Sequence, residues 1–123
     1  QLTRRIVRAC QHPGVHVIAH PTGRLWPTRP SYELDMTEIY KVCRETNTAL
    51  ELSANPRRLD IKDVLARAAK DAGVRIAINT DAHEVSNLGD MRFGVGMARR
   101  AWIEPQDVLN HMTCRDLLKA IRR

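Results

Sequence analysis

Two short motifs contain side chains that could bind a metal ion. His20 opens the run His-Pro-Thr-Gly-Arg, and Asp81 and His83 stand two residues apart in the run Asn-Thr-Asp-Ala-His. Two imidazoles and one carboxylate suit Zn, Mn or Fe better than Mg or Ca, which prefer oxygen ligands alone. A metal ion held there could polarise a phosphoryl oxygen and supply hydroxide near neutral pH. His20, Asp81 and His83 are therefore candidate metal ligands and catalytic residues.

Each motif alone also has an ordinary structural explanation. A single histidine after a strand is more often a hydrogen-bonded structural residue, and Asp81 could simply cap a turn. The metal hypothesis gains weight because both motifs follow predicted strands. The other histidines, His12, His16 and His111, lack this placement and are interpreted as structural.

Further polar residues follow the same predicted strands. The planar guanidinium of arginine matches the geometry of phosphate oxygens, so phosphate binding is predicted for side chains in the loops after the first and second predicted strands. The alternative is that these charged residues simply form a solvated surface. These candidates are Arg24, Asn55, Arg57 and Arg58.

One carboxylate falls inside a predicted strand. Glu51 would be costly to bury there unless it is paired or lies near a metal. Two alternatives stay open for it: a supporting position behind the metal ligands, or a buried pair with Arg75. Thr80, which precedes Asp81, is a second candidate for such support.

The predicted elements alternate between strands and helices. Apolar, β-branched runs predict strands near residues 15–19, 48–52 and 74–79. Helices are predicted before the first strand, after caps at Asp35 and Asp60, over 91–100 and 105–109, and after a cap at Thr113. Strand-helix-strand repeats of roughly thirty residues indicate a parallel sheet, whose carboxyl ends gather on one face.

Three strands cannot close a barrel. They could form a small open sheet or one arc of a (β/α) barrel, and the opening helix without a preceding strand favours the arc. Hydrophobic residues make up 43% of the chain and aromatic residues only 4%, so the core must be mostly aliphatic.

The charge balance favours an anionic partner. Twenty Lys and Arg against fourteen Asp and Glu give a formal net charge of +6. Such an excess suits nucleic acid or a phosphorylated substrate, with solubility as the alternative explanation. No apolar run approaches the ~20 residues that span a bilayer, so no membrane association and a cytoplasmic location are expected. Three widely spaced cysteines are consistent with buried thiols in a reducing compartment.

The ordered motifs closely resemble the end of the PHP domain, named for polymerase and histidinol phosphatase, in bacterial family X DNA polymerases. The matching runs are residues 20–24, 49–51, 54–56, 58–60, 79–83, 91–95 and 98–100. The resemblance implies that residues 1–123 are the C-terminal part of a distorted (β/α) barrel, with about three parallel strands and flanking helices. The N-terminal half of the barrel and a polymerase domain would precede them in the same chain.

The resemblance also implies an activity. PHP domains of this kind hold several Mn²⁺ or Zn²⁺ ions and act on DNA as 3'-5' exonucleases or end-processing enzymes in repair. Metal-ligand roles carry over to His20, Asp81 and His83. Two alternatives remain: a phosphatase for a small monoester such as histidinol phosphate, and a non-catalytic scaffold. The isolated chain is expected to be inactive because further ligands lie upstream, and its oligomeric state stays open.

Overall fold

A small parallel sheet lies at the centre of the molecule. The computed structural model describes residues 1–121, in which β1 (Val17–Ile18), β2 (Ala49–Ser53) and β3 (Ile76–Asn79) pair in the order β1-β2-β3. Both pairings are parallel, with Val17 opposite Ala49 and Leu50 opposite Ile76. The predicted α/β class with three parallel strands is confirmed. The arc of a barrel remains a prediction.

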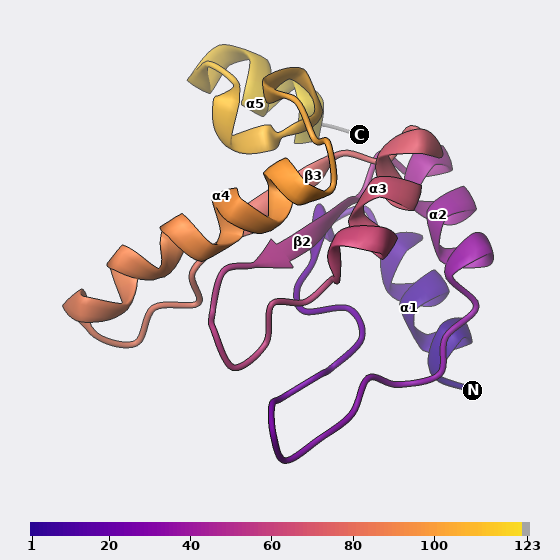
Figure 1. Ribbon diagram of the computed structural model, residues 1–123. Helices are drawn as coiled ribbons and strands as arrows, with labels where there is room; N and C mark the ends of the chain where they lie inside the picture. The colour runs from indigo at the N-terminus through magenta and orange to yellow at the C-terminus, as the bar shows by residue number, and fades with distance from the viewer. Residues whose placement is uncertain (122–123) are drawn as a thin grey trace.

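Five α-helices accompany the sheet within residues 1–121 (Figure 1). They are α1 (Leu2–Cys10), α2 (Met36–Glu45), α3 (Asp63–Asp71), α4 (Met91–Arg100) and α5 (Cys114–Ile121). Three short 3₁₀ segments lie at Val85–Asp90, Pro105–Asp107 and Leu109–His111. None of the described helices is long and apolar enough to cross a lipid bilayer.

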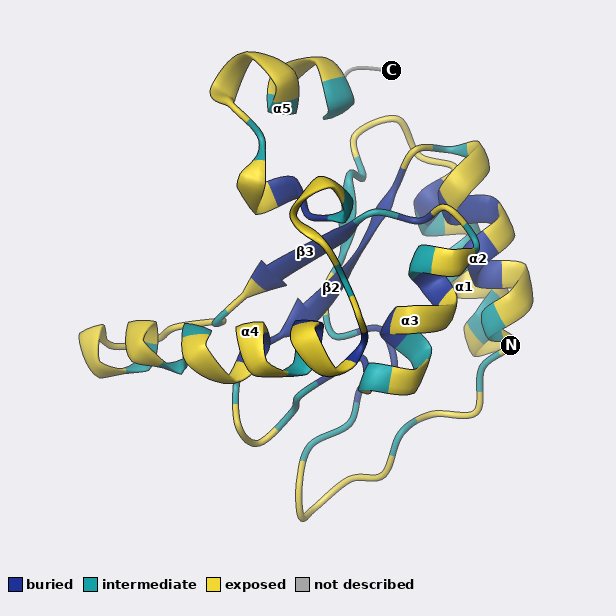
Figure 2. Cartoon of the chain, turned by 45° about the horizontal axis from the view of Figure 1, so that its top comes forward, coloured by how far each residue is buried: buried dark blue, intermediate teal, exposed yellow. Residues whose placement is uncertain are grey.

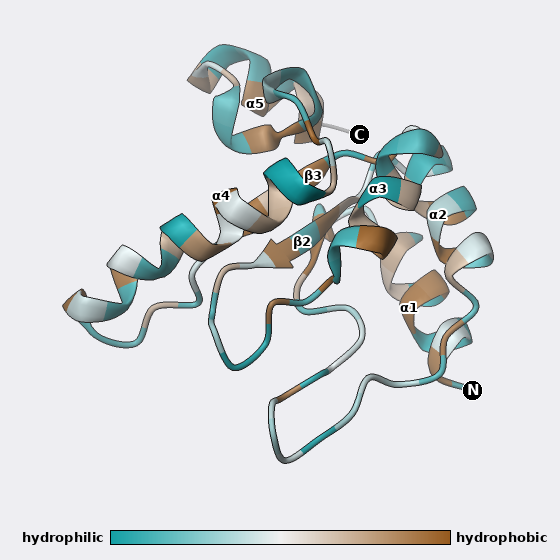
Figure 3. Ribbon diagram, in the orientation of Figure 1, coloured by the Kyte–Doolittle hydropathy of each residue, from teal (hydrophilic) through white to brown (hydrophobic). Residues whose placement is uncertain are grey.

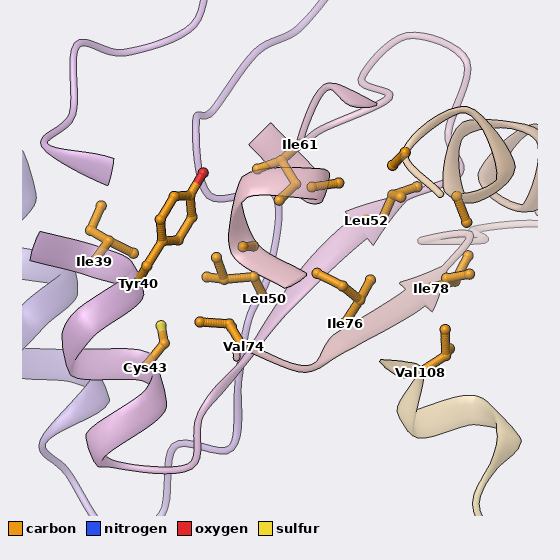
Figure 4. Close-up of a cluster of buried hydrophobic side chains, with 14 of the residues drawn as sticks. Ile39, Tyr40, Cys43, Leu50, Leu52, Ile61, Val74, Ile76, Ile78 and Val108 are labelled. Atoms are coloured by element: carbon orange, nitrogen blue, oxygen red, sulfur yellow. The ribbon is translucent and has the colours of Figure 1, made fainter. Parts of the chain in front are cut away.

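One face of the sheet carries the main core. Leu50 and Leu52 of β2 and Ile76 and Ile78 of β3 are all buried on this face, which α1 to α4 cover (Figure 4). Burying one such side chain contributes roughly 1.5–3 kcal/mol, so this aliphatic layer dominates the stability of the fold. Figure 2 shows β2 and most of β3 in dark blue, with both arrows pointing the same way, and Asn79 at the end of β3 is exposed.

The opposite face of the sheet carries a small apolar cluster and, at one end, polar side chains. Ala49 and Ala77 pack against Leu109 there, near the start of the strands. Because side chains alternate along a strand, Glu51 and Asn79 lie on the same face, nearer the carboxyl ends. Figure 3 shows that the long loop between β1 and α2 is mostly hydrophilic as well. The sequence thus divides the sheet into an aliphatic face and a face with polar groups at one end.

The two outer edges of the sheet differ. The Asn110 side chain accepts a hydrogen bond from Ile78 N–H and donates one to the Ile78 carbonyl, both at 2.8 Å. Val108 also forms a parallel bridge with Ile76. The outer edge of β3 is therefore occupied, whereas β1 has no strand beyond it within residues 1–121.

Two predicted helix caps are confirmed and one is wrong. Asp35 accepts from the Glu38 N–H at 3.0 Å, and the Thr113 hydroxyl accepts from Asp116 N–H at 3.2 Å. Asp60, however, does not cap α3, whose N-cap residue is Lys62. Its side chain is buried and bonds to Thr22 instead.

Position 94 of α4 lies so close to neighbouring residues that only glycine fits there without a shift. A Cβ atom there would lie 2.6 Å from Ile78 Cγ2 and 2.8 Å from Ala54 Cβ. We expect Gly94→Ala to lower the free energy of unfolding by about 1–3 kcal/mol, because α4 must move off the sheet. At Gly96 of the same helix, an added Cβ would meet no atom within 4 Å, so Gly96→Ala is the matched control. It should raise stability by about 0.5–1 kcal/mol in urea unfolding. Equal effects of the two changes would contradict this packing.

The ionisation of the buried Tyr40 side chain should lower the free energy of unfolding at high pH. Burial, with a smaller contribution from Cys43, raises the pKa of Tyr40 to about 12 from 10.0. The folded state therefore retains the phenolic proton more strongly than the unfolded state. This contribution is present below pH 10 and is lost as pH rises from 10 through 12. A shift of this size corresponds to roughly 2–3 kcal/mol. Chemical denaturation across this range should show a steeper loss for the native chain than for Tyr40→Phe, and identical slopes would contradict the prediction.

Candidate metal and phosphate site at the strand ends

The predicted placement of the two motifs is confirmed. His20 follows β1 and Asp81 follows β3, so both lie beyond the carboxyl ends of parallel strands, at the same end of the sheet. Both have left-handed backbone angles, with φ of 31° at His20 and 53° at Asp81. This conformation is uncommon for residues other than glycine and is concentrated at functional sites.

Glu51 connects these two strand ends. Its Oε2 accepts from the His20 N–H at 2.6 Å, and its Oε1 accepts from Asn79 Nδ2 at 3.0 Å. Only 4% of Glu51 is exposed, and both bonds are part-buried, so the carboxylate itself is largely shielded from water. The carboxylate is engaged by these groups rather than by Arg75. Glu51 thus supports the candidate ligands by fixing the backbone at His20.

The His83 ring is held by the backbone. Its Nδ1 lies 2.6 Å from the Asp81 carbonyl oxygen, and the His83 N–H donates to Asn87 Oδ1 at 3.2 Å. With Nδ1–H donating to a carbonyl, Nε2 is the nitrogen left to accept, an arrangement usual for histidines that bind metals. Asp81 and His83 are both exposed.

The three candidates do not form a complete ligand set. Within residues 1–121, no group of three or more His, Cys, Asp or Glu side chains is placed to hold a metal ion. The common edge is therefore as expected, and the convergence of His20, Asp81 and His83 on one point stays a prediction. Their role as ligands stays a prediction.

The loop arginines have partners that the sequence did not indicate. Arg24 donates from Nε to the Arg58 carbonyl at 2.7 Å and from Nη2 to the Leu59 carbonyl at 2.6 Å. Arg58 donates in return to the Arg24 carbonyl at 3.3 Å. These bonds join the loop after β1 to the loop after β2. Arg24 and Arg58 therefore hold the two loops together, which leaves fewer of their donors for phosphate.

Arg57 and Asn55 lie in the same pair of loops. Asn55 Oδ1 accepts from the Arg57 N–H at 2.9 Å, so the asparagine shapes the turn after β2. The Arg57 side chain is exposed, with Nε 3.5 Å from the Trp26 carbonyl. Of the predicted phosphate-binding arginines, Arg57 has the most accessible guanidinium.

A buried carboxyl supports the His20 loop. Asp60 Oδ2 accepts from the Thr22 N–H at 3.0 Å, and Oδ1 accepts from the Thr22 hydroxyl at 2.8 Å. Burial raises the pKa of Asp60, while the Thr22 bonds and the positive charges of Arg24 and His20 oppose that rise. Asp60 therefore fixes the turn two residues after His20.

Sequence reasoning missed two further residues on this face. Asn79 supports Glu51, and the alternation of side chains along β3 is the signal that could have identified it. Ser53 ends β2, and its buried hydroxyl has no partner within residues 1–121. Thr80, predicted to give support, is half-buried between Asn79 and Asp81.

Comparison with known proteins gives related sequences but no matching protein-family model. The chain is 43% identical over 122 residues, 99% of its length, to the DNA polymerase/3'-5' exonuclease PolX of Bacillus subtilis. It is 28% identical over 108 residues to a probable phosphatase of a Thermoanaerobacter species and 30% identical over 114 residues to one of Proteus mirabilis. Each phosphatase match covers 88% of the chain.

These relatives, together with the polar strand-end face, place the chain among sequences related to phosphate-ester enzymes. More particularly, the predicted resemblance to bacterial family X DNA polymerases is confirmed by the identity with PolX over almost the whole chain. The chain spans 21% of the length of PolX and 44% of the length of the two phosphatases.

Proposed function

We propose that this chain is part of a site for metal-dependent phosphodiester hydrolysis on DNA, acting as a 3'-5' exonuclease or end-processing enzyme in repair. The observation that carries the proposal is the 43% identity over 99% of the chain to a polymerase/3'-5' exonuclease. The strand-end placement of His20 and Asp81 supports it, because α/β enzymes build their sites there. The rest of the PHP barrel and a polymerase domain belong to the same parent protein in this proposal.

The proposed cofactors are Mn²⁺ or Zn²⁺ ions, with His20, Asp81 and His83 supplying part of the ligand set. The remaining ligands must come from elsewhere in the parent protein, because residues 1–121 hold no complete group. When bound, such ions polarise a phosphoryl oxygen and lower the pKa of water.

The residues of this chain position the reacting groups. Glu51 fixes the His20 backbone, and the Asp81 carbonyl orients the His83 ring so that Nε2 faces away from its own backbone contact. Arg57 is the side chain best placed to meet a phosphate. A displaced ligand ring costs activity because reacting groups must be held within fractions of an ångström.

A second candidate is a phosphatase that acts on a small phosphate monoester. The likeness to two probable phosphatases favours it, although their identity with the chain is lower than that of PolX.

Chelation tests the proposed activity. Purified parent protein should degrade a 5'-labelled DNA strand from its 3' end, lose the activity in EDTA and regain it on addition of Mn²⁺. The same samples should release phosphate from p-nitrophenyl phosphate far more slowly. Hydrolysis that survives chelation would contradict the metal proposal, and a preference for the monoester would favour the phosphatase.

A further inference from the structure

Two loops at the strand-end site carry positive charge and no acidic residue. They are residues 20–32, which follow β1, and residues 53–59, which follow β2. Together the two loops contain four arginines, Arg24, Arg29, Arg57 and Arg58. None of the ion pairs within residues 1–121 includes these side chains. The charge of the loops is therefore not neutralised by salt bridges within the described chain. We call the two segments the paired loops.

Trp26 lies at the tip of the first of the paired loops. Leu25 and Arg29 exchange two backbone hydrogen bonds, at 2.9 and 2.7 Å, which close the turn that contains Trp26. The Trp26 N–H also donates to the Arg57 carbonyl at 2.6 Å, in the second loop. The tryptophan is nevertheless 71% exposed, so its ring does not anchor the loop within the described chain. The backbone is fixed while most of the indole ring remains in contact with water.

The paired loops are held to each other and not to the free edge of β1. Arg24 donates to the Arg58 and Leu59 carbonyls, and Trp26 donates to Arg57, so these bonds all run from the loop after β1 to the loop after β2. Figure 1 shows both loops extending away from the helices, one beside the other. Because β2 is the middle strand, they join on the side of β1 opposite to its unpaired edge. A further strand beside β1 would pair on the other side.

An exposed aromatic ring beside an exposed arginine matches single-stranded nucleic acid. Such strands are bound by aromatic rings that stack on bases and by cationic side chains that contact phosphates. The exposed Arg57 has its Nε 3.5 Å from the Trp26 carbonyl, so one tip presents both a stacking surface and a phosphate-binding group. In a duplex the faces of each base are covered by its neighbours, and a ring can stack only at an end. The combination therefore favours a single strand.

We propose that Trp26 stacks on a base of a single DNA strand and that Arg57 contacts the adjoining phosphate, at the same end of the sheet as His20. Arg24 and Arg58 contribute indirectly, because their bonds to backbone carbonyls keep the paired loops together. This inference rests on the proposed function, because it specifies how the DNA substrate of that site is held.

Tryptophan fluorescence of the parent protein, measured in EDTA, tests the stacking without hydrolysis. Oligothymidylate should quench the part of the emission that disappears in Trp26→Phe, because stacking on a base quenches indole fluorescence. Acrylamide should quench the same emission in the free protein and lose access once the strand is bound. A Trp26 emission that oligothymidylate leaves unchanged would overturn the proposal. So would a Trp26 that acrylamide cannot reach before DNA is added, because another part of the parent protein would then cover the ring.

The kinetics of strand degradation give a second measurement. Trp26→Ala should raise KM for a 5'-labelled single strand about tenfold, while kcat falls less than about threefold. Trp26→Phe should retain most of the affinity because its ring can still stack. Arg57→Gln should lower the salt slope of log(kcat/KM) by about 0.7, the contribution of one single-strand phosphate contact. A KM that rises equally in Trp26→Phe and Trp26→Ala would argue against stacking.

The second tryptophan of the chain provides the matched control. Trp102 is 68% exposed, with the Arg67 guanidinium 4.7 Å from its ring centroid, but it follows α4 and lies outside the paired loops. Trp102→Ala with Arg99→Gln removes the same ring and charge as Trp26→Ala with Arg57→Gln, and should change KM less than about twofold. Equal losses in the two double variants would overturn the proposal. Quenching of Trp26 by oligothymidylate in a parent protein that shows no metal-dependent hydrolysis would reject the proposed activity alone.

Discussion

His83→Ala in the parent protein is expected to lower metal-dependent DNA hydrolysis by more than about 100-fold. Loss of a group that merely supports a ligand already costs about 10–100-fold, and His83 is itself a proposed ligand. Its ring is held by the Asp81 carbonyl at 2.6 Å, which fixes the position from which the imidazole would bind a metal ion. Nucleotide addition should be unchanged, because that reaction belongs to a separate domain in the proposed parent.

His111→Ala is the matched control for this change. His111 is exposed in the 3₁₀ segment Leu109–His111, which lies between α4 and α5 and outside the loops that follow β1, β2 and β3. Degradation of a 5'-labelled strand and primer extension should be measured on the same preparations. Hydrolysis that falls equally in both variants, or that persists in His83→Ala, would remove His83 from the site.

The isolated 123-residue chain is expected to show no DNA hydrolysis above background with Mn²⁺ or Zn²⁺. Within residues 1–121 no group of three or more ligand side chains is assembled, so an ion would be held by too few groups to fix its position. Without a fixed metal position, the attacking water cannot be oriented toward a phosphorus atom. Correct orientation of reacting groups lowers the activation barrier by about 7–11 kcal/mol in favourable cases.

Equal molar amounts of chain and parent protein, assayed on the same labelled strand, provide the comparison. Metal-dependent cleavage by the isolated chain that disappears in His83→Ala would show that the described residues suffice for catalysis.

Local sequence patterns were sufficient to predict the arrangement of the strand ends. Apolar runs before His20 and Asp81 indicated buried strands, and helices between them indicated parallel pairing, which the registers confirm. The common edge follows from those two facts alone. Glu51 could be recognised as unusual for the same reason, since a charged residue interrupted an apolar run.

Contacts between distant loops could not be predicted in this way. Arg24 has its hydrogen-bond partners 34 and 35 residues away, at the carbonyls of Arg58 and Leu59. Asp60 was assigned to a helix cap because local spacing allowed it, but its partner Thr22 is 38 residues away. The spacing around Asp60 is compatible with a helix cap and with a tertiary contact. Only the folded chain shows that the tertiary contact forms.

The unequal edges of the sheet limit how copies of this chain can join. The Asn110 amide occupies the backbone groups of Ile78 that a further strand on the β3 side would need. Among the described residues, only the β1 edge, two residues long, is left for strand pairing. In the proposed parent protein, the rest of the barrel would pair with that β1 edge, so neither outer edge of this sheet would be left for a second copy. Asn110 and the Val108 bridge to Ile76 thus cover the β3 edge without adding a full strand to the sheet.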